Sequence, residues 1–558
     1  MASRQPRPDS IASAPIRLLE SSGPESSVSA RLDSAPRAGL YLLIVAVASG
    51  VFVRAIIAAL AGGFPVNDGG LFYALVEDVK ASGYRLPDFT SYNGGEVPFA
   101  YPPLAFYAGA LTSDVGGLST THVLVILPFL FSVLTILAVY LLSREYFRSS
   151  VLAGLAVVVF ALVPRSFGWE IAGGGLTRSP GFFFAVLAIW QGYRMYSQWN
   201  RTSYLLAALF GGLAILFHPE MGWFVAFTLA GCYLAKDRTG RGLLRSVSVG
   251  LGVLVLAMPW WLGVLVRMGP EPLLSAGQSG STPILPVLRL LTFDFTEEPF
   301  FPIAAGLGLL GVLATVKRRE HLLTLWLVAI FALDARMAAT TSMVPLSMLA
   351  AIGLRDVVGP LVREAVPRAA VPGGEGLPRW AYGVAAVLVL VVAPLATLFA
   401  ATENDSPLHF LSAGNRDAMS WVNSNTPAGA PFLVMPSTTG WQIDAPSEWF
   451  PALAARRSIS TVQGYEWLGA ASFRAQQKRY TELQRCAIQS SECLSAWREA
   501  TGLSFDYVYV SKGVPPSDRH RHPGQKIDCC AGLRANLAFS SEYVQVYDGP
   551  GATIFRRR

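Results

Sequence analysis

Charged residues are scarce in this sequence. Asp, Glu, Lys and Arg account for 15% of its 558 residues, whereas soluble domains carry roughly a quarter. Hydrophobic residues make up 52% of the chain, and apolar stretches of roughly 15 to 22 residues, the length of a membrane-spanning helix, recur through the first 400 positions. This composition excludes an entirely soluble protein and predicts a polytopic α-helical membrane protein.

Several motifs are absent as well. The chain contains no P-loop, no Gly-x-Gly-x-x-Gly after a strand and no Cys-x-x-Cys, so an ATP-driven or dinucleotide-binding protein has no support. Residues 1–38 are rich in Ser, Pro, Ala and Arg and lack an apolar run long enough for a signal peptide. We expect these residues to form a disordered cytoplasmic tail.

The apolar stretches predict about eleven spans in a transmembrane domain at 39–402, with a long first outer loop at 62–122. The predicted spans are 39–61, 123–143, 149–164, 181–197, 204–217, 221–235, 247–266, 302–316, 322–334, 340–354 and 381–402. Lys and Arg favour cytoplasmic loops. With the N-terminus inside, 20 of them lie on inner segments and 7 on outer loops before residue 403. We therefore expect a multi-pass plasma-membrane protein with a cytoplasmic N-terminus.

The same bias accounts for the net charge of +7, so nucleic acid is not an expected partner. The expected partners are membrane lipids. Arginine outnumbers lysine by 38 to 6, which favours a bacterial source with a GC-rich genome.

Residues 403–558 predict a soluble extracytoplasmic α/β domain. NRDAMSWVNSNTPAGAPFLVMPS indicates a helix, a turn and a buried strand, and SISTVQGY, FDYVYVS and YVQVYDG indicate further strands. Helical patterns lie at about 470–485 and 493–501. Glu448, Tyr465, Glu466 and Trp467 also lie here, and we expect most of them in a hydrophobic core rather than against a sugar.

Four of the five cysteines, Cys486, Cys493, Cys529 and Cys530, lie in this domain. An even number outside the membrane favours disulfides, with free thiols in a small core as the alternative. Three pairings are possible. The pairing that we expect least is the one that joins the adjacent Cys529 and Cys530, because a disulfide between neighbouring residues closes a strained ring.

The first outer loop opens with Asn67-Asp68-Gly69-Gly70, followed by an amphipathic helix suited to the membrane interface. Asp68 is either the N-cap of that helix or a general base at the membrane surface. Further along, YPPLAFY carries Tyr101, which belongs either to an aromatic belt or to a platform that stacks on a sugar ring.

Other polar residues gather in the predicted outer loops. RSFGWEIAGGGLTRSPG supplies Glu170 and Arg178, FHPEMGW supplies His218 and Glu220, and Arg336 follows a span. Arginine binds phosphate oxygens, and polar residues in so apolar a neighbourhood are often functional. The alternative for each is an ordinary loop, turn or interfacial residue. A divalent metal is conceivable, but two ligands in FHPE are too few to predict one, so no cofactor is predicted.

These segments resemble the GT-C family of membrane glycosyltransferases, which use polyprenyl-phosphate sugars and include protein O-mannosyltransferases and bacterial mannosyl- and arabinosyltransferases. The likeness is carried by PVNDGGLFYALVEDVKASG, YPPLAFY, GGGLTR and HPE. It implies that Asp68 is the catalytic base, Glu170 a second-loop acid and Arg336 a phosphate-binding arginine. The metal dependence of some relatives is not implied, because the first motif has one acid and the second loop has no Asp-x-Asp or Glu-x-Asp.

Together these features predict an inverting hexosyl- or pentosyltransferase of the cell envelope. It would transfer a sugar from a polyprenyl-phosphate donor to a glycan, lipid or protein acceptor on the outer face. Arg178 and Arg336 would bind the lipid phosphate, beside a second polar site of Glu170, His218 and Glu220. The alternatives are a transporter of lipid-linked sugar or polysaccharide, in which polar residues lie near mid-membrane, and a non-catalytic envelope assembly protein.

Overall fold

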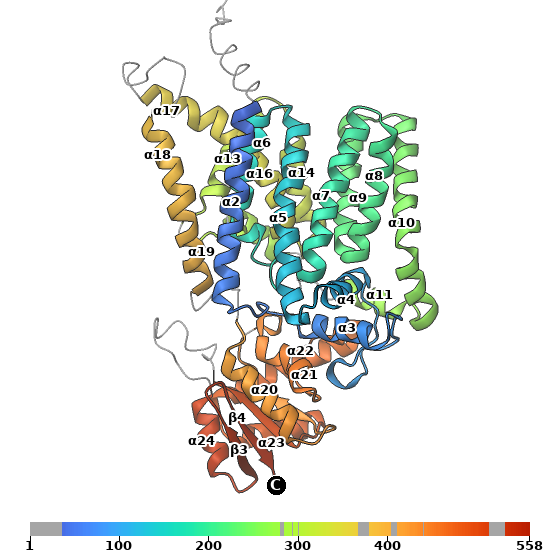
Figure 1. The fold of residues 1–558 in the computed structure, drawn as a ribbon, viewed down its shortest axis with the longest axis vertical. Coiled ribbons are helices and arrows are strands. Elements are labelled where there is room, and N and C mark those ends of the chain that lie inside the picture. The colour runs from blue at the N-terminus through green and yellow to red at the C-terminus, as the bar shows by residue number, and fades with distance from the viewer. Residues whose placement is uncertain are drawn as a thin grey trace, which may run out of the picture.

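The computed structural model of the chain describes residues 36–173, 175–278, 284–292, 294–299, 301–365, 379–402, 410–438, 440–512 and 530–558. Long helices form a bundle at one end, and a smaller domain with a β-sheet forms the other (Figure 1). Two short helices, α3 (Gly70–Ala81) and α4 (Leu104–Gly116), lie at the end of the bundle that faces this domain. The predicted tail at 1–38 lies outside the described residues except for its last three, which belong to the first helix.

Every segment predicted as a span coincides with helix in this bundle. The helices are α2 (Pro36–Leu60), α5 (Thr120–Phe147), α6 (Ser150–Leu162), α7 (Gly175–Ser197), α8 (Arg201–Phe217), α9 (Pro219–Lys236), α10 (Gly240–Met268), α13 (Ile303–Lys317), α14 (Leu322–Leu333), α15 (Ala338–Thr341), α16 (Met343–Gly353), α18 (Arg379–Val387) and α19 (Ala393–Thr402). Helix α17 (Gly359–Ala365) follows α16, and α11 (Glu271–Gln278) and α12 (Ile284–Thr292) lie between α10 and α13 in the chain.

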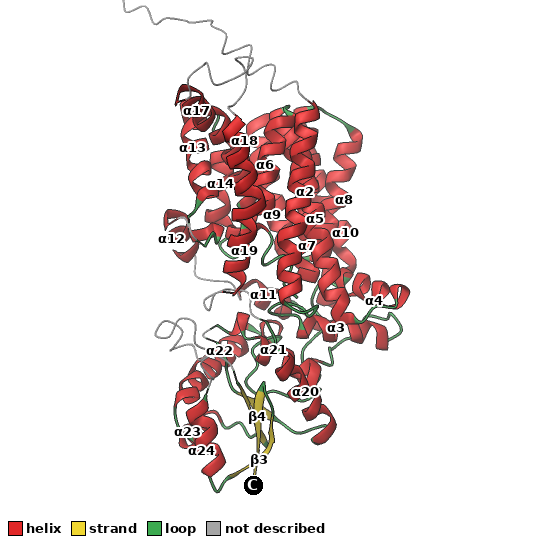
Figure 2. Ribbon diagram, turned by 60° about the vertical axis from the view of Figure 1, so that its left-hand side comes forward, coloured by secondary structure: helices red, strands yellow, loops and turns green. Residues whose placement is uncertain are grey.

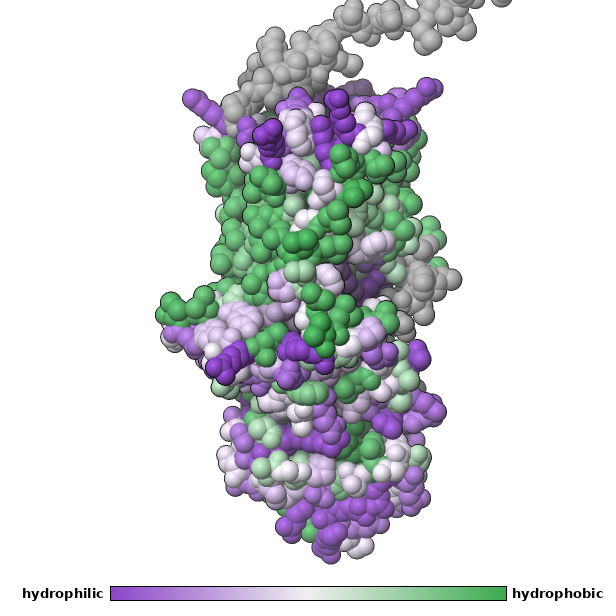
Figure 3. Space-filling view, turned by 90° about the vertical axis from the view of Figure 1, so that its right-hand side faces the viewer, coloured by the Kyte–Doolittle hydropathy of each residue, from purple (hydrophilic) through white to green (hydrophobic). Residues whose placement is uncertain are grey.

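The surface of the bundle is apolar. Among the described residues, four helical segments are long and apolar enough to cross a membrane, namely Arg37–Leu60, Thr120–Phe147, Gly240–Met268 and Ala338–Glu364, and four shorter helices are apolar. Leu251, Leu254 and Val255 of α10 are more than half exposed, and Figure 3 shows a hydrophobic band on this face between more hydrophilic ends. Such a surface is suited to lipid, and the number of eleven spans stays a prediction.

Glycines bring α13 and α16 into close contact. A Cβ atom at Gly311 would lie 1.9 Å from the carbonyl oxygen of Leu349. Helices in lipid gain little from the hydrophobic effect and associate through close packing of this kind. The backbones of α13 and α16 therefore touch at Gly311.

The C-terminal region folds into helices packed on one mixed sheet, which confirms its predicted α/β character (Figure 2). Its helices are α20 (Ala413–Asn425), α21 (Ala445–Ala454), α22 (Ala470–Gln484), α23 (Ser491–Thr501) and α24 (Ala531–Phe539). Its strands are β1 (Phe432–Val434), β2 (Tyr507–Ser511), β3 (Tyr543–Asp548) and β4 (Ala552–Arg557). In the order β1-β2-β4-β3, β1 is parallel to β2, and the other pairs are antiparallel. The extracytoplasmic location of this domain stays a prediction.

The prediction of a strand at SISTVQGY is wrong. Only Ser458 forms a bridge there, with Phe432. The hydroxyl of Ser460 donates to the carbonyl of Val434 (2.7 Å) and accepts from its amide (3.2 Å). A side chain thus takes the place of a neighbouring strand. Strand β4 and helices α4, α21 and α24 are not among the predicted elements.

The disulfide pattern also differs from expectation. Cys486 and Cys493 are bonded, with their Cα atoms 5.4 Å apart across the turn into α23. Cys530 is disulfide-bonded too, and Cys529 lies outside the described residues. The bond between Cys486 and Cys493 belongs to the pairing that we expected least, because the short turn between them brings these two cysteines together.

Replacing Gly311 by alanine should destabilise the bundle by about 1 to 3 kcal/mol, because the added methyl group overlaps the backbone of Leu349. Gly306→Ala is the matched control in the same helix. No atom of the described residues lies within 4 Å of its Cβ position, so this change should be neutral or slightly stabilising. Thermal unfolding in detergent measures both variants, and equal melting temperatures would contradict the contact.

Candidate active site

The loop that carries Asp68, residues 61–69 (the Asp68 loop), lies against the loop before α7. The carbonyl oxygen of Val66 accepts a hydrogen bond from the amide of Gly173 (2.8 Å). A Cβ atom at Gly173 would come within 1.6 Å of the Asp68 carbonyl oxygen, so only glycine permits this approach. The two predicted outer loops that carry Asp68 and Glu170 are therefore in backbone contact.

Asp68 is not the N-cap of α3. The N-cap residue is Gly69, with φ of 147°. The carboxylate that accepts the first amides of the helix belongs to Glu448 of α21. Its donors are the amides of Gly69 (3.0 Å), Gly70 (2.8 Å) and Leu71 (2.9 Å). The interpretation of Asp68 as a helix cap is therefore wrong, because a residue from the C-terminal domain performs that role.

The Asp68 carboxylate pairs instead with Arg178, in the first turn of α7. Its Oδ1 lies 3.4 Å from Nη2 of Arg178, and the two side chains are 19% and 17% exposed. The guanidinium also lies over the ring of Trp169, 5.7 Å from its centre. Asp68 and Arg178, which are singled out from separate motifs, are thus in contact where solvent reaches them.

Glu170, in the loop before α7, is buried. Its side chain has no hydrogen-bond partner for either carboxylate oxygen among the described residues. Burial raises the pKa of Glu170 to about 7, against the opposing effect of Arg178 and Arg165. Arg165 itself pairs with Glu297 at 2.6 Å. Within the described part of the chain, no group of three His, Cys, Asp or Glu side chains is placed to hold a metal ion.

A second set of polar contacts connects four predicted site residues. Nδ1 of His218 lies 2.8 Å from the hydroxyl of Tyr101, and Nε2 lies 3.3 Å from Oε2 of Glu220. The other oxygen of Glu220 pairs with Nε of Arg336 at 3.1 Å. Burial lowers the pKa of His218, so the imidazole is neutral near pH 7. These four side chains form one continuous polar chain.

Thr177 connects this polar chain to the first pair. Its hydroxyl lies 3.2 Å from that of Tyr101, and Arg178 is the next residue along α7. At the far end of the chain, Arg336 is 47% exposed. The two polar groups therefore meet at the start of α7, and each keeps an arginine accessible to a ligand.

Three residues of the C-terminal domain reach the site and are not among the predicted site residues. Glu448 caps α3, the indole of Trp449 donates to the carbonyl of Asn67 (2.9 Å), and the ring of Trp467 lies 5.3 Å from that of Tyr101. Trp449 and Asn67 are 382 residues apart in the chain. Since such partners share no local pattern, no sequence signal points to these contacts. The role of Tyr101 as a sugar platform stays a prediction.

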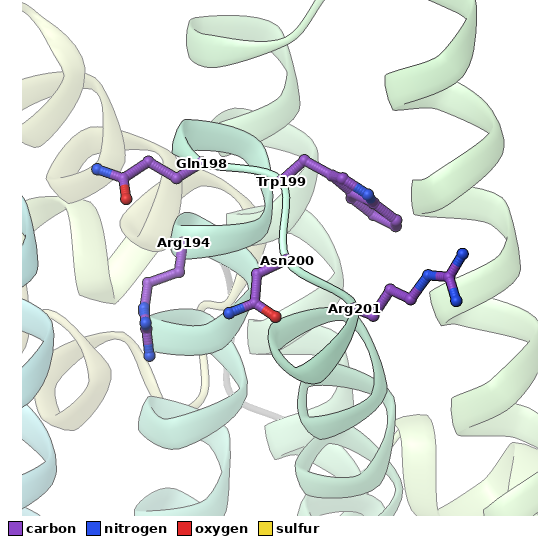
Figure 4. A pocket seen from close by; sticks show the side chains of 5 residues that line it. All are labelled: Arg194, Gln198, Trp199, Asn200 and Arg201. Carbon is purple, nitrogen blue, oxygen red and sulfur yellow. The ribbon is translucent and has the colours of Figure 1, made fainter.

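A cavity of about 460 Å³ lies at the other end of α7. It is lined by Arg194, Gln198, Trp199, Asn200 and Arg201. Figure 4 shows Arg194 and Gln198 on one side of the turn between α7 and α8, and Trp199 and Arg201 on the other. Arg194 is about 24 Å along α7 from Arg178. The cavity is separate from the candidate site, and its charged side chains do not converge.

Glu170→Gln should make stability less dependent on pH. The folded-state pKa of Glu170, about 7, exceeds its ordinary value of 4.5, so between these values the folded state holds a proton that the unfolded state has lost. Stability is therefore highest below about pH 4.5 and falls as pH rises to about 7, by a total of about 3 kcal/mol. The glutamine variant lacks this titration. Its melting temperature in detergent should rise relative to that of wild type between about pH 5 and 8. Parallel curves of melting temperature against pH for the two proteins would contradict the raised pKa of Glu170.

One family model, described as dolichyl-phosphate-mannose-protein mannosyltransferase, matches residues 100–265. This range contains five of the site residues and leaves out Asp68 and Arg336. The five are Tyr101, Glu170, Arg178, His218 and Glu220. No curated protein matches the sequence.

Three solved structures are similar in fold. The archaeal oligosaccharyltransferase AglB from Archaeoglobus fulgidus, in complex with an inhibitory peptide and a dolichol-phosphate, has a TM-score of 0.51 at 16% identity, over 85% of this chain and 69% of that chain. The arabinofuranosyltransferase AftD from Mycobacteria has a TM-score of 0.52 at 17% identity, over 92% and 40%. ArnT from Cupriavidus metallidurans, bound to undecaprenyl phosphate, has a TM-score of 0.51 at 14% identity, over 92% and 97%.

At these identities the structural likeness concerns the fold, whereas the family model adds a likeness in sequence. The structural likeness agrees with the predicted GT-C resemblance, and the family model agrees with it for the motifs around Tyr101, Arg178 and His218. The chain is therefore a membrane protein with the fold of the GT-C glycosyltransferases, and over residues 100–265 it resembles the dolichyl-phosphate-mannose-protein mannosyltransferases.

Proposed function

We propose that this chain is an integral-membrane glycosyltransferase that takes a sugar from a polyprenyl-phosphate donor on the outer face of the membrane. The observation that carries the proposal is the contact of Asp68 with Arg178, from two different loops, in a protein of the GT-C fold. A partly exposed carboxylate held by a guanidinium can accept a proton while it stays in place. The lipid phosphates bound to AglB and ArnT support the class of donor.

In the proposed reaction, Asp68 accepts the proton of an acceptor hydroxyl as the hydroxyl oxygen attacks the anomeric carbon of the sugar. The bond between that carbon and the phosphate oxygen breaks on the opposite side, so the configuration is inverted. The polyprenyl phosphate leaves with the electron pair. Arg178 holds Asp68 through the 3.4 Å contact and stabilises the negative charge that develops nearby.

The leaving phosphate is assigned to the arginines of the site. The N-terminus of a helix is ordinarily a good anion site, but at α3 the carboxylate of Glu448 already accepts the amides. Arg178 and Arg336 are both partly exposed, and a guanidinium matches phosphate oxygens with two parallel donors. We therefore place the phosphate between the start of α7 and the end of the polar chain.

A narrow apolar crevice of about 10 Å³ lies beside the Asp68 loop, and its apolar lining is suited to contact with the prenyl chain of the donor. Residues of α2, α5 and both loops line it, namely Ile57, Ala58, Phe64, Val66, Val125, Phe129 and Ile171. Val66 is two residues from Asp68, so a prenyl chain that packs against these apolar side chains would have its phosphate near the site. The proposal covers hexosyl and pentosyl donors and glycan, lipid or protein acceptors.

The main buried charge within the bundle does not favour a transporter. Arg54 of α2 is fully buried, and its guanidinium donates to the hydroxyl of Ser132 (2.8 Å) and to the carbonyls of Gly50 (3.0 Å) and Ala161 (3.1 Å). These contacts join three helices. Arg54 is therefore a packing residue rather than part of a path through the membrane.

Asp68→Asn should lower kcat by about 10²- to 10⁴-fold, because an amide cannot take up the proton of the acceptor. The assay is transfer from a panel of radiolabelled polyprenyl-phosphate sugars by the purified protein, with and without EDTA. The control is Asp88→Asn, in which the acid lies elsewhere in the first outer loop (62–122) and is 69% exposed, and it should keep wild-type activity. Equal rates for wild type and Asp68→Asn would exclude Asp68 as the base, and loss of transfer with EDTA would add a metal to the mechanism.

Arg336→Gln should weaken binding of undecaprenyl monophosphate by about 10- to 100-fold, the worth of a hydrogen bond to a charged group. Fluorescence-based titration of the lipid in detergent gives Kd. Arg267→Gln serves as control, since Arg267 pairs with Asp88 outside the site and its loss should leave Kd unchanged. A wild-type Kd for Arg336→Gln would rule out the assignment.

A further inference from the structure

We propose that the C-terminal domain completes the active site, and that Glu448 of α21 is a positioning residue that holds the Asp68 loop in its reactive geometry. The inference rests on the proposed function, since it concerns the placement of the base in that reaction. Glu448 acts through the backbone. Its carboxylate contacts the main chain that follows Asp68.

The first contact fixes the chain directly after Asp68. The opening amides of a helix have no partner inside that helix. In α3, three consecutive amides donate to Glu448 at 2.8 to 3.0 Å. The two carboxyl oxygens of Glu448 accept all three amides, and burial together with the nearby charge of Asp68 raises the pKa of Glu448 to about 8. The start of α3 is therefore bound to α21.

The second contact fixes the chain directly before Asp68. The indole of Trp449, also on α21, donates to the carbonyl oxygen of Asn67 at 2.9 Å. In return, the hydroxyl of Tyr92 in the first outer loop donates to the carbonyl oxygen of Glu448 at 2.6 Å. Asp68 thus lies between two peptide units that are both held by one helix of the other domain.

Helix α21 is itself held firmly. Its N-cap, Asp444, accepts hydrogen bonds from the hydroxyls of Ser437 (2.6 Å) and Tyr480 (2.7 Å) and from the amide of Ser447 (3.5 Å). Asp444 and Tyr480 are buried. A site residue is placed accurately when its own support is rigid, and the support of Glu448 has this property.

The glycines after Asp68 leave room for α21. A Cβ atom at Gly69 would lie 2.7 Å from the ring of Trp449, and one at Gly70 would lie 2.6 Å from the carbonyl oxygen of Glu448. The pair of glycines in the NDGG segment is therefore explained by the close approach of the C-terminal domain.

Amide hydrogen exchange tests the geometry without reference to activity. In Glu448→Ala, exchange at Gly69, Gly70 and Leu71 should become about fivefold faster, which is the effect expected for the loss of a helix cap. Glu499→Gln changes an exposed acid of the same domain and should leave these rates unchanged. Unaltered exchange in a folded Glu448→Ala protein would overturn the proposal.

Kinetics test the consequence for the reaction. Glu448→Ala should lower kcat about 100-fold, the effect of a base displaced by about 1 Å, while the KM for the donor stays near wild type. Glu448→Gln should restore part of kcat, since its amide oxygen still accepts from Gly69 and Gly70. Trp449→Phe, which removes the indole donor together with part of the buried ring, should lower kcat as well and applies even where the alanine variant fails to fold. A wild-type kcat in folded Glu448→Ala, or a change in KM alone, would refute the positioning role.

The two proposals fail in different ways. If the wild-type protein transfers no sugar from any polyprenyl-phosphate donor, the proposed function is wrong, and the exchange rates still decide whether Glu448 holds the loop. If wild type and Glu448→Ala transfer equally well, the proposed function stands and the role of Glu448 falls.

Discussion

Three amides at the start of α3 have no partner in their own helix, and the carboxylate that accepts them lies 377 to 379 residues further along the chain. A buried amide left without a partner costs about 1 to 3 kcal/mol, so three of them constrain strongly where the C-terminal domain lies. Helix α21 accordingly packs against α3, at the end of the bundle that faces the domain. This contact decides the path of the main chain on both sides of Asp68.

The charges around Asp68 divide into a supporting set and an accessible set. Glu448 accepts hydrogen bonds from backbone amides, and Glu220 contacts both His218 and Arg336. Asp68, Arg178 and Arg336 keep part of their surface open, and to these we assign the proton transfer and the phosphate. Burial alone does not separate the two sets, because the side chain of Glu220 is 26% exposed and that of Asp68 is 19% exposed; their contacts distinguish them.

Glu170 differs from the other acids of the site because neither of its oxygens has a partner among the described residues. Positive charges lie near it, but burial outweighs them and raises its pKa. A carboxyl in such a place is neutral over part of the physiological range. Gly173 on the same loop and Arg178 in the first turn of α7 make the contacts to the Asp68 loop.

The sequence by itself determined the helices of the bundle and the identity of several polar residues at their ends. In lipid, a helix satisfies its own backbone groups, so hydropathy along the chain suffices to locate it, and each predicted span coincides with helix. His218, Glu220 and Arg336 can also be recognised in the sequence, because polar side chains beside apolar runs are rare.

Only the tertiary structure decided which groups become partners. The NDGG segment by itself leaves Asp68 as either a helix cap or a general base, but the side chain that accepts the first amides of α3 is Glu448. SISTVQGY has the composition of a strand, but the hydroxyl of Ser460 occupies the hydrogen-bonding groups of Val434. The polar chain from Tyr101 to Arg336 draws on three separate stretches of sequence. A hydrogen bond forms when two groups meet in space, and packing of whole elements brings most of these groups together. Except for His218 and Glu220, which are two residues apart, no short window of the sequence contains both partners.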